Sequence, residues 1–186
     1  MKTIFKHLKN KEFSLAIDLI DPNISHQLVV PNDIKNQKKI DEWINTRQLI
    51  KSLWPQLNVS HNKYGAPQVE KRAISISHTN KYVGVILSQK KAAIDIEKIR
   101  PKALKLSSKF MSNQETLKFK DQESASICWS AKECMFKIHQ VGNVDFIKDL
   151  RVEAIEKDFV ICYMFDQCIK LNFEKFDDHV LVYYYE

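Results

Sequence analysis

The stretch Ala92-Ala93-Ile94-Asp95-Ile96-Glu97-Lys98 decides the fold, because it alternates apolar and acidic side chains in the middle of the chain. On a β-strand, residues at i and i+2 point to the same face, so Asp95 and Glu97 share one face. The isoleucines of the stretch then point into a core on the opposite face. Neighbouring carboxylates repel each other, which favours a bound cation, and oxygen ligands suit Mg²⁺. The alternative is a strand end that carries two solvated acids.

Composition limits the class of protein. The chain has 186 residues, 44% of them hydrophobic and 28% charged, which is enough for one large domain or two small lobes with a core. Its 3 glycines form none of the glycine-rich phosphate-binding motifs, and its 4 cysteines include no Cys-x-x-Cys pair that would suggest zinc. No signal peptide or membrane-spanning run is recognisable, so we expect a cytoplasmic protein with free thiols.

The net charge of +6 is unevenly distributed along the chain. Residues 1–90 carry 14 Lys and Arg against 7 Asp and Glu, whereas residues 91–186 carry 15 against 16. A basic first half can meet phosphates, an acidic protein or nucleic acid. The alternative is an ordinary solvated surface with scattered lysines.

Residues 1–90 are predicted to combine strands with one helix. Pro31-Asn32-Asp33 indicates a helix start with Asp33 as N-cap, and apolar residues at helical spacing continue until Pro55 ends the helix. His78-Thr79-Asn80 is predicted to form the turn between two paired strands. The predicted strands cover residues 13–20, 73–77 and 82–88.

Residues 91–186 are predicted to continue from the central strand into helices and then strands. A helical region over residues 104–119 is interrupted near Ser112, and a stronger helix over residues 124–140 ends before Gly142. The last four predicted strands cover residues 150–155, 159–165, 168–173 and 180–185. Both halves combine a helix with strands, so we predict an α+β fold of two lobes, residues 1–90 and 91–186.

Three further segments contain residues that can carry chemistry. Ser75-Ile76-Ser77-His78 ends a strand, and its histidine can bind an anion or be an ordinary turn residue. Residues 129–137 (WSAKECMFK) place Glu133 and Lys137 at i and i+4 on one helix face, either as a surface ion pair or as a metal ligand beside a phosphate partner. Residues 110–115 (FMSNQE) have a capping-box pattern, and this local role suffices for Glu115.

In this order, the segments resemble the phosphopantetheinyl transferases of the larger, surfactin-synthetase-activating type. That family has Ser-His after a strand, then Gly-Ile-Asp-Ile-Glu, then Phe-x-Ser-x-x-Glu, then Trp-Ser-x-Lys-Glu-x-x-x-Lys. The matching segments here are residues 76–78, 93–97, 110–115 and 129–137, with Arg47 in the first-lobe helix and Tyr64-Gly65-Ala66-Pro67 at a Tyr-Gly-Lys-Pro turn. The resemblance spans roughly residues 43–152.

The resemblance implies a fold of two pseudo-symmetric α+β lobes, each a helix packed on a small antiparallel sheet. It implies Mg²⁺-dependent transfer of 4′-phosphopantetheine from coenzyme A to a serine of an acyl or peptidyl carrier protein, with release of 3′,5′-ADP. The carrier would be acidic and would serve fatty acid, polyketide or nonribosomal peptide synthesis. We expect a monomer without a nucleic-acid or membrane partner.

The resemblance also implies a role for each matching residue. Asp95, Glu97 and Glu133 would hold Mg²⁺. Glu133 would accept the serine proton, while Lys137 would pair with phosphate oxygens. The residues implied to bind coenzyme A are Arg47, Tyr64, Gly65, Ser77, His78, Thr79, Asp95 and Lys137, with Arg47 and His78 on its 3′-phosphate.

Two residues depart from the family pattern. Ala66 stands where the family has a lysine that contacts coenzyme A, and Lys63 is the nearest residue that can replace it. Ala93 stands where the family has glycine. One alternative is therefore a degenerate member of the family that binds coenzyme A or a carrier without turnover. A nucleic-acid-binding protein is the other, but basic residues are not interleaved with aromatic ones in any one stretch.

Overall fold

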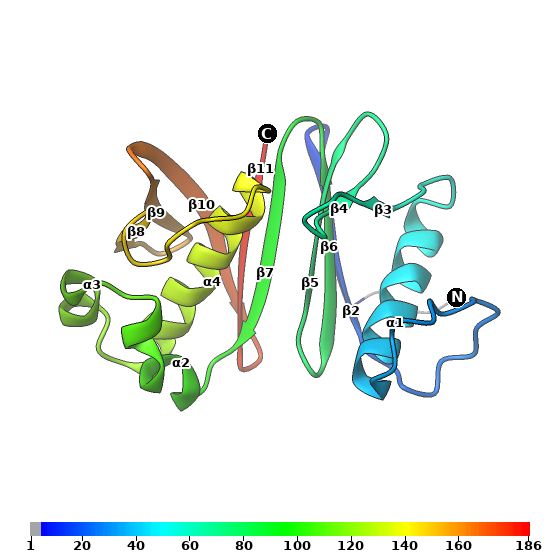
Figure 1. The fold of residues 1–186 in the computed structure, drawn as a ribbon, viewed down its shortest axis with the longest axis horizontal. Coiled ribbons are helices and arrows are strands. Elements are labelled where there is room, and N and C mark those ends of the chain that lie inside the picture. Colours follow the sequence, from blue (N-terminus) through cyan, green and yellow to red (C-terminus); the bar gives the residue numbers. More distant parts are fainter. Residues whose placement is uncertain (1–4) are drawn as a thin grey trace.

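The computed structural model describes residues 5–186, which form an α+β fold with two antiparallel sheets (Figure 1). The strand order of the first sheet is β1 (Lys6–Lys9), β2 (Phe13–Leu19), β6 (Tyr82–Ser88) and β5 (Ala73–His78). The strand order of the second sheet is β7 (Ala92–Lys98), β11 (His179–Tyr185), β10 (Gln167–Phe176), β9 (Phe159–Met164) and β8 (Leu150–Ile155). A two-stranded sheet joins β3 (Ser60–His61) to β4 (Pro67–Gln68).

Each large sheet carries one long helix on the face that is turned away from the other sheet (Figure 1). The helix α1 (Gln37–Leu53) covers the first sheet, and α4 (Gln122–His139) covers the second. The shorter helices are α2 (Pro101–Lys105), the 3₁₀ turn η1 (Ser107–Lys109) and α3 (Asn113–Lys118). Within residues 5–186, no helix combines the length and apolar character that crossing a membrane requires.

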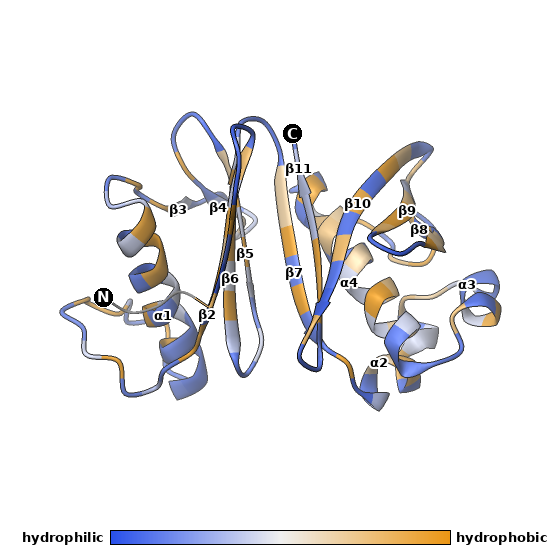
Figure 2. Cartoon of the chain, turned by 180° about the vertical axis from the view of Figure 1, so that it is seen from behind, coloured by the Kyte–Doolittle hydropathy of each residue, from blue (hydrophilic) through white to orange (hydrophobic). Residues whose placement is uncertain are grey.

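The sheets pack against each other through apolar residues of β2, β6, β7 and β11. Near the middle of Figure 2, much of the β7 ribbon has the orange colour of hydrophobic residues. Ile94 and Ile96 belong to this central core and are fully buried, whereas Asp95 lies on the opposite face of β7, towards α4. The predicted alternation along β7 is therefore confirmed. A Cβ atom on Gly84 of β6 would lie 2.6 Å from Cδ1 of Ile96, so a larger residue there would force the isoleucine side chains of β7 to shift.

Most predicted elements are present, but three helix boundaries differ from the prediction. Asp33 does not cap α1, because it lies in a turn closed by the bond from the Ile34 N–H to the Pro31 carbonyl, at 3.0 Å. Asn36 caps the helix instead. The helix α4 begins at Gln122 rather than at residue 124 and ends before Gly142 as predicted, with Gln140 in the left-handed conformation (φ 57°). The region predicted as helix over residues 104–119 is divided into α2, η1 and α3, and strands β1, β3 and β4 were not predicted.

Candidate functional site

The acidic cluster lies where α4 packs on β7. Asp95 is only 4% exposed, and Nζ of Lys137 lies 2.7 Å from its Oδ1 atom. The hydroxyl of Ser77, from β5 of the other sheet, donates to the same oxygen at 3.1 Å. The second oxygen, Oδ2, is buried and has no hydrogen-bond partner in the structure. A buried carboxylate oxygen without a partner is costly, and such an atom suggests a position for a ligand or ion.

Glu97 and Glu133 carry raised pKa values beside Asp95. Burial, followed by the charge of Asp95, raises the pKa of Glu97, while a hydrogen bond from Nε1 of Trp129 at 3.0 Å opposes the increase. Burial, followed by repulsion from Asp95, raises the pKa of Glu133 to about 7, although Lys137 opposes the increase. The three carboxylates therefore interact electrostatically, and their environment disfavours three negative charges without a cation.

Lys137 does not form the surface ion pair with Glu133 that was one alternative. No ion pair links these two side chains in the part of the chain that the structure describes, and Nζ of Lys137 instead donates to Asp95 and to the carbonyl of Ile94, at 2.8 Å. Burial acts to lower the pKa of Lys137, but the charge and hydrogen bond of Asp95, together with Cys134 and Glu133, outweigh burial, and the pKa is raised. Lys137 is therefore a charged side chain directed into the cluster.

The three carboxylates do not form a ready-made metal site. Over residues 5–186, no group of three His, Cys, Asp or Glu side chains is arranged so that it could hold a metal ion. The donor set nevertheless fits a hard divalent cation, since all its atoms are carboxylate oxygens and Oδ2 of Asp95 is free to coordinate. Glu97 and Glu133, the other two carboxylates, are partly exposed.

An open cavity of about 620 Å³ lies between α1, the segment around Gly65 and the end of β5. Its basic lining residues are Lys39, Arg47, His61 and His78, and Asp33 and Glu42 are its acidic ones. Arg47 stacks on Trp43 at 5.4 Å from the ring centre, and no ion pair to Arg47 forms within the described chain. Unpaired positive charge in an open cavity suits an anion.

The ring of His78 is held by Thr46. The Thr46 hydroxyl donates to the carbonyl of Glu42 at 2.6 Å, so it must accept a hydrogen bond from Nε2 of His78, 2.8 Å away. Nδ1 of the neutral ring is then the atom available to a ligand. His78 is exposed to the cavity. Desolvation by the surrounding chain, followed by the positive charges of Lys137 and Lys38, lowers the pKa of His78 to about 4, and an anionic ligand would raise it again.

Of the three predicted coenzyme A-binding residues Tyr64, Gly65 and Thr79, Gly65 lines the cavity and the other two do not. Gly65 lines the cavity with φ 82°, and its turn is stabilised by the side-chain oxygen of Asn62, which accepts from the Tyr64 N–H at 2.9 Å. Tyr64 is 54% exposed and is not among the cavity-lining residues. Thr79 accepts from the backbone of Tyr82 at 3.0 Å, so it stabilises the β5–β6 turn rather than the cavity.

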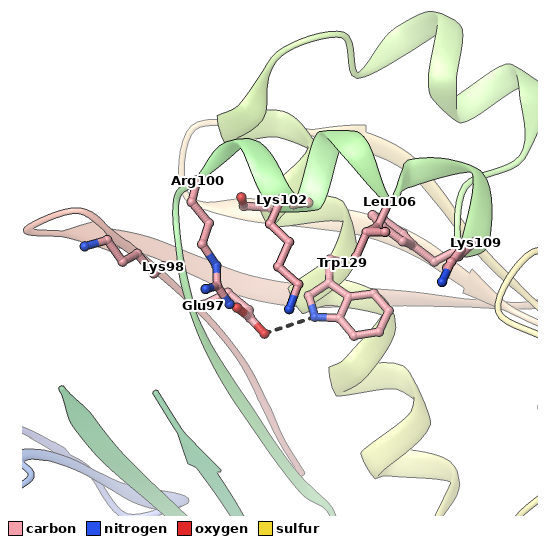
Figure 3. A pocket seen from close by; sticks show the side chains of 10 residues that line it. Glu97, Lys98, Arg100, Lys102, Leu106, Lys109 and Trp129 are labelled. Atoms are coloured by element: carbon pink, nitrogen blue, oxygen red, sulfur yellow. Dashed lines mark hydrogen bonds between the residues drawn. The ribbon is translucent and has the colours of Figure 1, made fainter. Parts of the chain in front are cut away.

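A second cavity, of about 250 Å³, lies between α2 and α4 and was not predicted (Figure 3). Glu97 and Trp129 of the acidic cluster form one wall, and the side chains of Arg100 and Lys102 are directed towards Glu97 in Figure 3. Leu106 and Phe110 add apolar surface. The signal in the sequence was the series of basic residues that directly follows Glu97.

Glu115 has a larger role than the predicted capping box, which is present. Both Glu115 and Lys132 are buried, and their charges pair at 2.8 Å. Lys132 also donates to the carbonyl oxygens of Phe110, at 2.7 Å, and Phe146, at 2.8 Å, and Glu115 accepts from the Val152 N–H at 2.7 Å. The pair fixes α4 to the segments that surround the second cavity.

In comparisons with known proteins, no family model and no curated protein matches this chain.

Proposed function

We propose that this protein transfers 4′-phosphopantetheine from coenzyme A to a serine hydroxyl of a carrier protein, as a Mg²⁺-dependent enzyme. One observation carries the proposal: Ser77 and His78 are consecutive residues of β5 that reach two different sites. Ser77 bonds to Asp95 in the acidic cluster, and His78 lines the cavity that Arg47 also lines. A cation-binding cluster beside an anion-binding cavity is the arrangement that a pyrophosphate with a further phosphate needs.

The residues of the acidic cluster and of the cavity would bind different parts of coenzyme A. Asp95, Glu97 and Glu133 would hold Mg²⁺, which when bound would supply positive charge to neutralise the pyrophosphate. Lys137 would bind a phosphate oxygen, because its ammonium group is already directed into the cluster. Arg47 and His78 would bind the 3′-phosphate, with Gly65 allowing close approach of the backbone.

The reaction joins the serine oxygen to the phosphorus of the phosphopantetheine group and breaks the bond from that phosphorus to 3′,5′-ADP. The serine loses its proton in this step, and Glu133 would accept it. Glu133 is the candidate because its side chain lies beside Asp95 and has no cationic partner among residues 5–186. The products are the modified carrier, 3′,5′-ADP and one proton.

The second cavity supports an acidic carrier as the partner. Arg100, Lys102 and Lys109 surround it beside Glu97, and no ion pair to these three forms among residues 5–186. Carrier acids could therefore pair with them while the carrier serine reaches the cluster. We further propose that the two sheets with their helices are the two pseudo-symmetric lobes of the transferase fold, in a cytoplasmic monomer.

The second candidate is a degenerate protein that binds coenzyme A without turnover, and Ala66 favours it, since the turn at Gly65 carries no lysine at that position. One experiment separates the two. The purified chain is incubated with Mg²⁺, coenzyme A and an apo-carrier, and the mass of the carrier is measured. Transfer adds one phosphopantetheine to the carrier and is lost with a chelator. Binding of coenzyme A without any mass gain would favour the degenerate protein.

A further inference from the structure

We infer that Ser77 is a positioning residue that fixes the Asp95 carboxylate so that one oxygen is kept for a divalent cation. This inference deepens the proposed function and rests on its metal assignment. Ser77 is buried and belongs to β5, whereas Asp95 belongs to β7, so the contact crosses from one sheet to the other.

The hydrogen-bond pattern at Ser77 determines the direction of its single proton. Its oxygen accepts from the Ile96 N–H at 3.0 Å, and its hydroxyl donates to Oδ1 of Asp95 at 3.1 Å. Lys137 donates to the same Oδ1 atom. Two donors therefore occupy Oδ1 and none occupies the buried Oδ2. The two oxygens of the Asp95 carboxylate are therefore not equivalent, and Oδ2 is the oxygen left for a ligand.

The strand β5 supplies a matched control two residues earlier. The oxygen of Ser75 accepts from the Ile94 N–H at 3.1 Å, so Ser75 makes the same link between β5 and β7 as Ser77. No hydrogen bond from Ser75 to a carboxylate forms within residues 5–186. Both serines are buried, at 4% and 5% exposure, so replacing either by alanine removes one comparable backbone contact. Only Ser77→Ala also releases Asp95.

The test measures Mn²⁺ as a probe of the divalent site, by calorimetry or electron paramagnetic resonance, with no carrier or turnover. Ser77→Ala should weaken Mn²⁺ binding about tenfold or more, since residues that orient a metal ligand typically contribute that much. Ser75→Ala should leave Mn²⁺ affinity within about twofold of the parent protein, because coupling is not expected at a site that makes no contact with the carboxylate. Both variants should lose thermal stability, and Ser77→Ala should lose more because it also removes the bond to Asp95.

A double variant distinguishes action through Asp95 from a general structural effect. In an Asp95→Asn background, Ser77→Ala should cause no further loss of Mn²⁺ affinity. If Ser77→Ala does not fold, Ser77→Cys replaces it, because a thiol preserves the side chain but donates only weakly.

Equal Mn²⁺ affinities for the two single variants would overturn the inference, as would absence of Mn²⁺ binding by the parent protein. Failure of the proposed function is a separate result: a parent protein that binds Mn²⁺ but transfers nothing to any carrier would leave the comparison of the two serines decisive.

Discussion

Nζ of Lys137 lies 2.7 Å from Oδ1 of Asp95, although 42 positions separate the two residues in the sequence. The ion pair connects α4 to β7 and leaves Glu133, one turn earlier on the helix, without a cationic partner among residues 5–186. Burial of Glu133 and its repulsion by Asp95 are therefore only partly offset by the charge of Lys137, and the pKa of Glu133 stays raised.

Asp95→Asn should abolish transfer while the protein remains folded. The amide retains the shape of the side chain and the neighbouring Lys137 keeps its bond to the Ile94 carbonyl, but the negative charge for a cation is lost. Carrier mass and the thermal midpoint are measured together. Wild-type transfer by Asp95→Asn in Mg²⁺ would show that the metal assignment is wrong.

Glu133→Gln should reduce transfer by about a hundredfold or more, because it removes both a ligand and a proton acceptor. The matched control is Glu123→Gln in the first turn of the same helix, where Glu123 forms an exposed ion pair with Lys175 at 2.8 Å. An exposed pair contributes about 0.2–1 kcal/mol, so the control should retain its activity. Equal losses in the two variants would contradict the assigned role of Glu133.

The raised pKa of Glu133 should make the stability of the metal-free protein depend on pH, and Glu133→Gln should reduce this dependence. Burial and then Asp95 raise the pKa of Glu133 to about 7, above its ordinary value of 4.5. Between these values the folded state binds more protons than the unfolded state, so the free energy of unfolding should fall as the pH rises. In urea titrations with a chelator, Glu133→Gln should decline less with pH than the parent protein. Parallel curves for the two proteins would refute the raised pKa.

Glu115→Ala should destabilise the protein by about 3–5 kcal/mol, because it leaves the charge of Lys132 buried without a partner. The control is Glu153→Ala, which breaks the exposed pair with Lys118 and should cost about 1 kcal/mol or less. Urea unfolding measures both variants. A small effect of Glu115→Ala would mean that Lys132 finds another partner or loses its proton.

Ala66→Lys should tighten binding of coenzyme A several-fold, because a charge-assisted contact with phosphate contributes about 1.5–3 kcal/mol before exposure reduces it. The gain should disappear with dephospho-coenzyme A if the lysine reaches the 3′-phosphate. Lys63 lies over the ring of Tyr64, 5.0 Å from its centre, and can fill this role itself. In that case, Lys63→Ala would weaken binding instead. If calorimetry finds no effect of either change, the turn does not contact coenzyme A.

The sequence by itself determined the elements whose causes are local. Alternation along residues 92–98 placed the isoleucines in the core, and the capping box at Ser112 and Glu115 involves residues only three positions apart. Strands β2, β5 and β6 were predictable because their apolar residues and turns lie within a few positions of one another. The N-cap of α1 was not predictable in this way. Asn36 caps the helix instead of Asp33, because Asp33 lies in a separate turn that precedes the helix.

Only the tertiary structure decided which charges are paired and which are left without partners. The contacts of Asp95 with Ser77 and of Glu115 with Lys132 join residues 18 and 17 positions apart, and they depend on how separate elements pack. The sequence could name Glu133 and Lys137 as neighbours on a helix, but it could not show that Lys137 turns to Asp95. Electrostatic energy depends on distance and burial, and both are fixed only when the second sheet and its helix come together.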